Sequence, residues 1–404
     1  MRWVLGVKLG LAVAMGLAAM PGAGAASALA ERLPQLKTMG PPAWLKPGVR
    51  LSFYGASATL PHTYSRYVPD ENGAWVDKET GERFDREKNY GSAGEGISQL
   101  DASVVGSERA LFSMRTFLLA TQDFGGKRLR PMGTTVAVGP VASCDDWYVN
   151  PATLAGLKAS HNDQVAILPM PYQLDGQTYD TVAFKHQTDN AYVCSFYDKA
   201  TGVMVASSSS VRKLTAGEPE STMLQIIRFK GMRQRDVSWA NEPAPTWLHT
   251  VQRFTAQGTH TLTTNGLAPM VTPLQVVAGV DERGADWFIW HRSATTGGGH
   301  GLPPQTTTAT MLAGPAQIGG LWMAPGALAR FTPGQVLDSD PLIGTQTSVA
   351  AVQGNLVQIR ETGQSHVIDC LYDSGSGQLQ RVRQTEQPMA GTTTVVDLQY
   401  SAAQ

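Results

Sequence analysis

Charged side chains are scarce in this chain of 404 residues. They make up 16% of it, and 32 Lys and Arg against 33 Asp and Glu leave a formal net charge of −1. Binding a nucleic-acid backbone or an anionic membrane surface normally needs a clear excess of positive charge. The composition therefore predicts that nucleic acid is not a partner of this protein.

Motifs that mark common active sites are also missing. The sequence has no Gly-x-Ser-x-Gly elbow, no His-x-x-x-His and no His-Glu-x-x-His. Its eight histidines are dispersed singly, and the glycine-rich residues 295–304 contain no lysine of the kind that a phosphate-binding loop carries. We predict no metal site and no cofactor, and the pattern favours a function other than catalysis.

Cysteine is rare as well, at three residues. An odd number allows at most one disulfide and leaves one thiol over. Cys194 and Cys370 are not at equivalent positions when the two halves of the chain are aligned, so a bridge within the first half is preferred. The sequence predicts a disulfide between Cys144 and Cys194, with Cys370 as a small buried apolar residue.

Long apolar runs are absent after the N-terminus. Arg2 and Lys8 form a basic leader before an apolar run at residues 9–20, and small residues follow at 23–30. This run is shorter than the roughly 20 residues needed to span a bilayer, and the pattern is that of a secretory signal peptide over residues 1–30. We predict an exported protein, periplasmic or extracellular, with no transmembrane segment after signal cleavage.

An internal repeat is the strongest positive signal. Residues 181–204 and 356–379 align without a gap, and in each an apolar-alternating run leads to Tyr-Asp, a turn closes on Gly, and a second run returns. Asp at the start of such a turn can accept a backbone hydrogen bond, and Gly supplies a positive φ. The residues are Tyr197, Asp198 and Gly202 in the first copy, and Tyr372, Asp373 and Gly377 in the second.

The repeat extends over both halves of the chain. Each half is predicted to contain a first strand, a hairpin, a further strand, a short helix beginning at Pro151 or Pro325, the Tyr-Asp hairpin and a last strand. The fold class is mostly β: two tandem antiparallel β-sheet repeats, each a curved sheet or half-barrel with one short helix. We place repeat 1 at residues 31–235 and repeat 2 at residues 236–404.

The main asymmetry between the halves is an insertion in repeat 1. Residues 63–96 are the most charged part of the chain and contain two turn signals, Asn72-Gly73 and residues 78–81. They predict a double hairpin that projects from the first half.

The paired hairpins are closed by a Tyr-Asp-x-x-Thr-Gly turn in the first half and by Tyr-Asp-x-x-Ser-Gly in the second, and are backed by little helix. They resemble those of the periplasmic lipoprotein carriers with LolA/LolB-like β-sheet folds. The resemblance covers one hairpin in each half, and no functional residue is transferred by it. It implies a concave sheet with an apolar inner face that binds acyl chains.

Three tryptophans are the candidate binding residues. Trp75 lies in the insertion, while Trp287 and Trp290 are three positions apart on a predicted strand and so point to opposite faces. An exposed Trp can stack on a sugar ring or an acyl chain, whereas a buried one belongs to the core.

The favoured function is an exported, non-enzymatic protein that binds a hydrophobic ligand or a protein partner of the cell envelope. Two alternatives stay open from the sequence. One is a secreted hydrolase with a site between the halves, built from Asp145, Asp146 and a distant His. The other is a structural or envelope-assembly component with exposed edge strands.

Overall fold

The computed structural model describes most of the chain beyond its N-terminal segment. The described residues are 39–61, 67–69, 75–77, 93–120, 128–144, 147–162, 164–213, 221–297 and 303–401. The predicted signal peptide at residues 1–30 lies outside them. Within the described residues, no helix is both long and apolar enough to cross a membrane.

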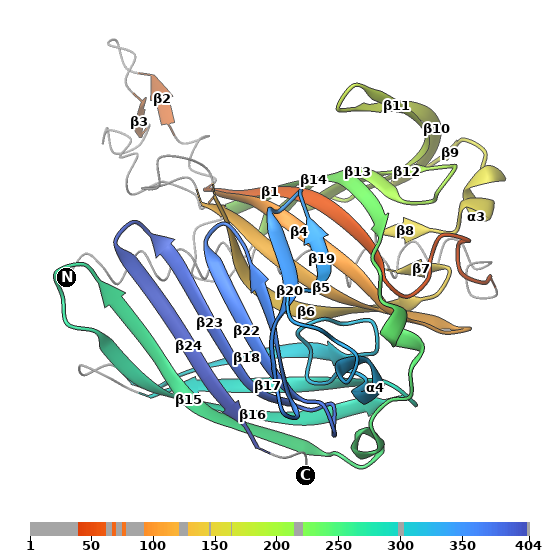
Figure 1. The fold of residues 1–404 in the computed structure, drawn as a ribbon. Helices are drawn as coiled ribbons and strands as arrows, with labels where there is room; N and C mark the ends of the chain where they lie inside the picture. Colours follow the sequence, from red (N-terminus) through yellow and green to blue (C-terminus); the bar gives the residue numbers. More distant parts are fainter. Residues whose placement is uncertain are drawn as a thin grey trace. The chain divides into compact units, whose positions relative to one another are not determined.

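Two ten-stranded antiparallel sheets account for nearly all of the described secondary structure (Figure 1). In the first sheet, the spatial order of the strands is β6 (Arg128–Pro140), β5 (Arg109–Ala120), β4 (Ala93–Val105), β1 (Val49–Pro61), β14 (Ser221–Gln234), β13 (Met204–Lys213), β12 (Ala191–Asp198), β11 (Gln177–Gln187), β10 (Val165–Leu174) and β9 (Ser160–His161).

The second sheet repeats this order strand for strand, and neither sheet closes on itself. Its spatial order is β18 (Gln305–Ala313), β17 (Phe288–Thr296), β16 (Met270–Arg283), β15 (Arg253–Thr264), β24 (Thr392–Tyr400), β23 (Leu379–Met389), β22 (His366–Asp373), β21 (Leu356–Thr362), β20 (Thr345–Gln353) and β19 (Val336–Asp340). The prediction of two tandem antiparallel sheets is therefore confirmed.

Each half also carries the predicted short helix. These are α3 (Pro151–Ala155) and α4 (Pro325–Leu328), and each begins with its proline, where the missing N–H costs no hydrogen bond. The Asn150 side chain caps α3 by accepting from the N–H of Ala152 at 3.0 Å. Two 3₁₀ helices, η3 (Ser238–Asn241) and η4 (Thr246–His249), precede the second sheet.

Each sheet has ten strands, more than the seven expected from the sequence for each half. The apolar run before Tyr197 is not continuous, because residues 188–190 turn the chain between β11 and β12. β10 contains Pro169 and Pro171, which argue against a strand in the sequence. Its neighbour β9 pairs with it only at Ala166 and Ile167, so most of its outer side is an edge, where a proline is tolerated.

The repeated turn forms as its residues predict. Asp198 Oδ2 accepts from the N–H of Thr201 at 3.0 Å, and Gly202 has a φ of 77°. In the second half, Asp373 Oδ1 accepts from the N–H of Ser376 at 2.7 Å, and Gly377 has a φ of 72°. The same local chemistry therefore closes the same hairpin in both sheets.

Two further pairs of short strands lie outside the large sheets. They are β2 (Tyr67–Pro69) with β3 (Trp75–Asp77), and β7 (Ser143–Cys144) with β8 (Tyr148–Val149). The β2–β3 pair flanks the predicted Asn72-Gly73 turn. The second hairpin predicted for the insertion lies outside the described residues.

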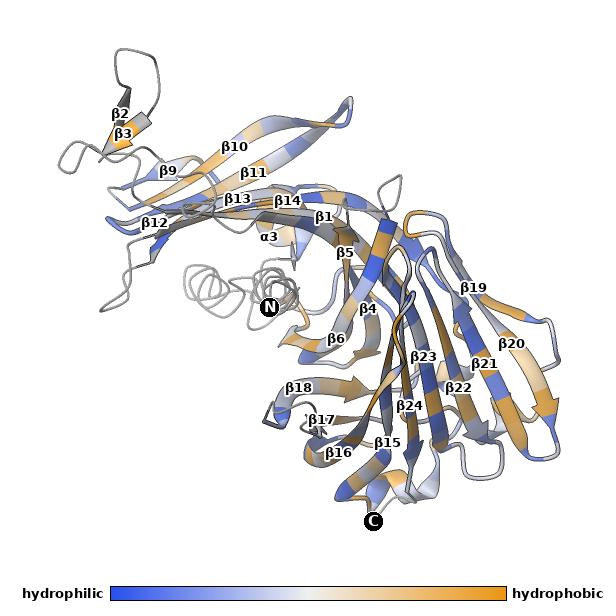
Figure 2. Cartoon of the chain, turned by 90° about the vertical axis from the view of Figure 1, so that its left-hand side faces the viewer, coloured by the Kyte–Doolittle hydropathy of each residue, from blue (hydrophilic) through white to orange (hydrophobic). Residues whose placement is uncertain are grey.

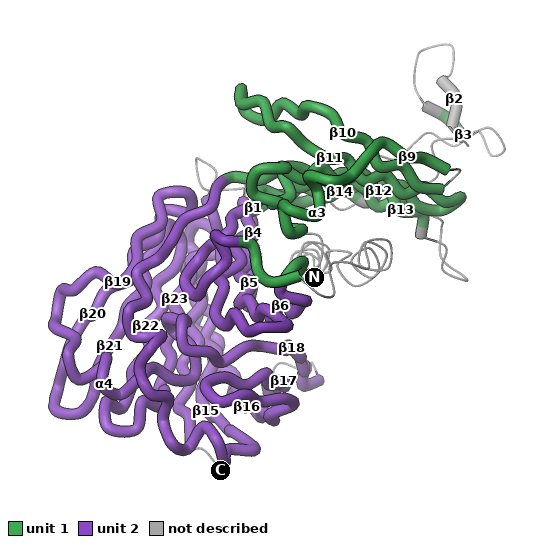
Figure 3. The backbone as a smooth tube through the Cα atoms, turned by 90° about the vertical axis from the view of Figure 1, so that its right-hand side faces the viewer, with its two compact units in different colours: residues 1–42, 53–96, 142–230 green, residues 43–52, 97–141, 231–404 purple. Residues whose placement is uncertain are grey.

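The chain divides into two compact units, shown in different colours in Figure 3. Unit 1 comprises residues 1–42, 53–96 and 142–230, and its described core includes Phe53, whose ring lies 4.6 Å from that of Trp147 and 5.6 Å from that of Phe229 between centroids.

Unit 2 comprises residues 43–52, 97–141 and 231–404, and thus holds β5, β6 and the whole second sheet. Hydrophilic and hydrophobic residues alternate along several strands of this sheet, as Figure 2 shows. Such alternation gives each strand one apolar and one polar face. The largest buried cluster of unit 2 lies around Trp322, Tyr372 and Phe288, which are at most 2% exposed.

Candidate functional site

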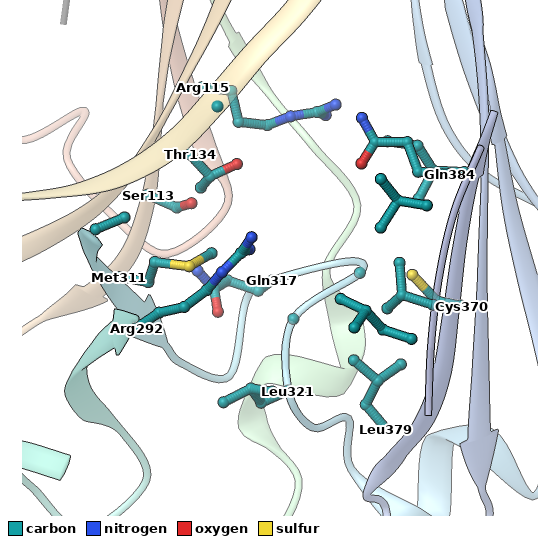
Figure 4. A pocket seen from close by; sticks show the side chains of 18 of the residues that line it. Ser113, Arg115, Thr134, Arg292, Met311, Gln317, Leu321, Cys370, Leu379 and Gln384 are labelled. Carbon is teal, nitrogen blue, oxygen red and sulfur yellow. The ribbon is translucent and has the colours of Figure 1, made fainter. Parts of the chain in front are cut away.

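Unit 2 contains a cavity with a volume of about 660 Å³ (Figure 4). β5 and β6 contribute one part of its wall, strands of the second sheet together with the segment 317–321 contribute another, and Arg50, Asp101 and Arg235 complete it. All of its lining residues belong to unit 2, so the cavity is a feature of one compact body.

Apolar residues outnumber polar ones in the wall formed by the second sheet, although polar residues such as Gln305, Thr307 and Gln384 also line it. On β24, alternate residues line the cavity, because successive side chains of a strand point to opposite faces. The apolar lining residues include Leu274, Trp290, Met311, Leu312, Ile318, Leu321, Ile359, Ile368, Leu379, Val382, Val396, Leu398 and Tyr400.

Several of these apolar side chains are only half-buried. Val382, Ile368, Val396 and Met311 keep part of their surface uncovered by protein although each faces the cavity. Apolar surface left in contact with water is unfavourable by about 25 cal/mol per Å² relative to buried surface. A bound apolar molecule would therefore gain stability by covering this wall.

An ion pair joins β5 to β21 at the polar side of the cavity. Arg115 donates to Glu361 through two bonds, from Nη1 to Oε2 at 2.8 Å and from Nη2 to Oε1 at 2.5 Å. His366 Nε2 lies 3.0 Å from Glu361 Oε1. Burial alone would raise the pKa of Glu361, but the charge of Arg115 and the hydrogen bonds from His366 and Arg115 outweigh it and lower that pKa.

A second, deeper ion-pair cluster surrounds Arg50 at the start of β1. Its guanidinium donates to Asp101 on β4 at 2.5 and 2.7 Å and to Asp340 on β19 at 2.8 Å. Burial works against the charge of Arg50, yet the neighbouring carboxylates raise its pKa overall. Arg235 Nε lies 3.6 Å from the same Asp101. These pairs fix the edge strand β19 against β4.

Arg292 on β17 has a different environment. Figure 4 shows its side chain extending from β17 into the cavity. Within the described part of the chain it makes no hydrogen bond or ion pair to a carboxylate. Its charge acts on Tyr400: burial raises the pKa of the Tyr400 hydroxyl, and the charge of Arg292 acts against that rise.

The tryptophans named from the sequence have different positions. Trp290 is 2% exposed and lines the cavity. Trp287 does not line it, and the Arg109 guanidinium covers its ring at 4.9 Å from the centroid. Trp75 lies on β3, and its side chain is outside what the structure describes. A ligand-binding role for any of the three remains a proposal.

All three cysteines are buried, and none forms a disulfide in the structure. The bridge predicted between Cys144 and Cys194 is thus absent from it. Burial raises the pKa of the Cys370 thiol to about 12, so the thiolate needed for nucleophilic attack is scarce at neutral pH. Cys370 lines the cavity as a small apolar residue.

Other candidate chemistry is either undescribed or not assembled. Asp145 and Asp146, considered for a hydrolase, lie outside the described residues. Among the residues that the structure does describe, no group of three or more His, Cys, Asp or Glu side chains is placed to hold a metal ion.

Sequence reasoning missed the charged residues of the cavity, among them Arg115, Arg292 and Glu361. A signal for Arg292 was present, because Trp290, Arg292 and Ala294 alternate along one strand and share a face. An arginine between two residues of a buried face is unusual, and it indicates that this face binds a polar or charged group. Arg115 and Glu361 are 246 residues apart, and no local pattern links them.

Comparison with known proteins gives little further guidance. No protein-family model matches the chain, and no curated protein matches it. Solved structures with some similarity include a double mutant of the vaccine antigen transferrin binding protein B from Haemophilus parasuis Hp5, at 7% identity and a TM-score of 0.16, covering 89% of this chain and 77% of that one. Another is intact Ap-TbpB with its N and C lobes, at 9% identity and a TM-score of 0.11, covering 89% and 79%. Scores this low support no inference about function.

Proposed function

We propose that this protein binds one small, largely apolar molecule in the cavity of unit 2, without chemical conversion. The observation that carries the proposal is a cavity of about 660 Å³. Apolar residues outnumber polar ones on its second-sheet wall, and several of them, among them Ile368, Val382 and Val396, are only half-buried. Cavities that hold small molecules have volumes of roughly 300–1,000 Å³ and combine such walls with a few polar groups.

Ordinary core packing does not account for this cavity. Protein interiors are close-packed, with few voids larger than a water molecule. In unit 2, by contrast, Val382 and Ile368 remain half-exposed beside a buried cluster that includes Leu379 and Ile359. A site that is filled by a ligand explains why apolar side chains are kept uncovered there.

The polar side of the cavity supports a preformed site. Arg115 and Glu361 join β5 to β21, and Arg50 joins β1 to Asp340 of β19. These buried charge pairs hold opposite walls in place before a ligand arrives. Binding to a preorganised site loses less conformational entropy than binding to one that must first be ordered.

The signal-peptide pattern of residues 1–30 supports a location outside the cytoplasm, in the periplasm or beyond the cell. There the ligand would be a hydrophobic molecule that needs shielding from water. The hairpin-level resemblance to periplasmic lipoprotein carriers favours the same ligand class, an acyl chain.

The test is a titration with the neutral fluorescent probe N-phenyl-1-naphthylamine. We would compare the wild-type chain with Val382→Trp, which fills the cavity from β23, and with Val271→Trp on β16, where the valine is 58% exposed and does not line the cavity. We expect saturable binding to the wild type and to Val271→Trp, and at least tenfold weaker binding to Val382→Trp.

Thermal unfolding of both variants, monitored by circular dichroism, checks that each is folded. Equal affinity for Val382→Trp and Val271→Trp would exclude the cavity as the binding site. Absence of saturable binding to the wild type would contradict the proposed function itself.

A further inference from the structure

We propose that the ligand is an anionic amphiphile, an apolar chain with an oxyanion head group, and that Arg292 binds this head group. This inference rests on the proposed function and specifies its ligand class. The observation behind it is a guanidinium that extends into a cavity with an extensive apolar wall and has no carboxylate partner among the described residues.

The register of β17 leaves room around Arg292. Its directly opposed residues are Ala278 on β16 and Ala309 on β18, and directly opposed residues of a sheet share a face. Both are alanines, too small to cover a guanidinium and without an acceptor group. Along β17 itself, the same face presents Trp290 and Ala294, which also line the cavity. The protein therefore supplies no neutralising group from these neighbouring positions.

The other three arginines of the cavity differ in this respect. Arg115 is bonded twice to Glu361, Arg50 is bonded to Asp101 and Asp340, and Arg235 Nε lies 3.6 Å from Asp101. The lining contains four arginines but only three carboxylates, Asp101, Asp338 and Glu361. Arg292 thus lacks the carboxylate partner that the other three arginines have. The charged side chains of the lining therefore carry one positive charge in excess.

An oxyanion fits that charge in geometry as well as sign. A guanidinium presents a planar fork of donors that carboxylates and phosphates accept in a bidentate manner. Such a pair is stronger where water is partly excluded, and Arg292 is half-buried. The Tyr400 hydroxyl lies in the same lining and, with its raised pKa, stays protonated at neutral pH and can donate too.

The apolar wall then takes the chain of the same molecule. Val396, Leu398 and Tyr400 face the cavity from β24, and Val382 faces it from β23. A molecule with an acidic head and an alkyl tail satisfies both parts of the lining at once. A neutral hydrocarbon would leave Arg292 partly desolvated without a partner, which is unfavourable.

The experiment compares head groups on one alkyl chain. Dodecanoate, dodecyl phosphate, dodecanol and dodecyltrimethylammonium compete with N-phenyl-1-naphthylamine for the full chain at pH 8, below their critical micelle concentrations. We expect both anions to displace the probe at concentrations at least about tenfold lower than dodecanol, since a hydrogen bond to a charged group contributes roughly a tenfold factor or more. The cation should be the weakest competitor.

The variant Arg292→Gln should remove the advantage of the anions over dodecanol, with each displacement referred to the affinity of that variant for the probe. Arg292→Lys keeps the charge without the planar fork and should retain part of the advantage. Arg383→Gln, at an exposed arginine on β23 that does not line the cavity, is the matched control and should behave as the wild type.

The outcomes separate the anionic head group from the apolar site. Equal displacement by dodecanoate, dodecyl phosphate and dodecanol would overturn the anionic head group but leave the apolar site in place. An anion preference that survives Arg292→Gln would assign the head group to another residue and overturn this inference. Probe binding that no dodecyl compound reverses would contradict both proposals. A preference for only one of the two anions would identify which head group the site takes.

Discussion

Arg115 and Glu361 come from strands far apart in the chain and form a bidentate ion pair in the cavity wall, with N–O distances of 2.8 and 2.5 Å. Their side chains are 21% and 13% exposed, so water screens the pair little. The pair joins β5 to the second sheet. Loss of this pair should therefore both lower the stability of unit 2 and displace the walls of the cavity.

Arg115→Met should destabilise the protein by about 3 kcal/mol, because it leaves a buried carboxylate without its partner. Arg360→Met is the control on the same strand as Glu361: Arg360 pairs with Asp369 at 2.7 Å but is 46% exposed, and removing an exposed pair costs less than about 1 kcal/mol. Urea denaturation of the two variants measures both losses. Similar losses would show that the Arg115–Glu361 pair has no special role.

Acid should weaken the protein partly through Glu361. Its pKa is lowered in the folded state, so the unfolded chain, with a glutamate pKa of about 4.3, binds the proton first as the pH falls. The stability that this carboxylate contributes is present above about pH 5 and is lost as the pH falls towards its folded pKa. Glu361→Gln should therefore be less stable at pH 7 but lose less stability between about pH 5 and 2. Unfolding free energies measured over that range would contradict this if both proteins lost the same amount.

The turn glycine of the second hairpin should not tolerate a side chain. Gly377 has a φ of 72°, and a Cβ there would lie 2.3 Å from the backbone oxygen of Met323. Gly354 has a φ of 60° with nothing within 4 Å. Gly354→Ala pays only the backbone strain, about 1–2 kcal/mol, and Gly377→Ala should cost clearly more. Thermal unfolding separates the two, and equal midpoints would mean that the close contact is relieved by a small shift.

The cysteines offer a test of both the structure and the sequence. Native protein should react slowly with Ellman's reagent, because all three thiols are buried and the pKa of Cys370 is about 12. After unfolding without reductant, the structure predicts three reactive thiols. One reactive thiol would instead support the Cys144–Cys194 disulfide predicted from the sequence.

Local chemistry is what the sequence predicted well. The turns at Asp198 and Asp373 and the helix starts at Pro151 and Pro325 depend on neighbours within a few residues, so their pattern is visible without a structure. The same pattern occurs in both halves of the chain, and this repetition is why the sequence predicts two sheets in tandem. β10 was missed because Pro169 argues against a strand unless its edge position is known.

The cavity was harder to predict from the sequence, because its walls come from segments that are far apart in the chain and meet only in the folded protein. Glu361 looks like an ordinary polar residue until β5 brings Arg115 to it. Trp290 was singled out for its ring, whereas Arg292, two residues along on the same face, carries the clearer binding signal. A rule that flags charges on the inward face of a strand would have found it.

The most direct test of a ligand-binding cavity is native mass spectrometry of the protein purified from the organism that encodes it, with extraction of whatever remains bound. We expect one small amphiphilic molecule per chain on the wild type and on Val271→Trp, and its loss from Val382→Trp. The same adduct on all three proteins would contradict binding in the cavity, and an unliganded mass for all three would contradict a tightly held ligand.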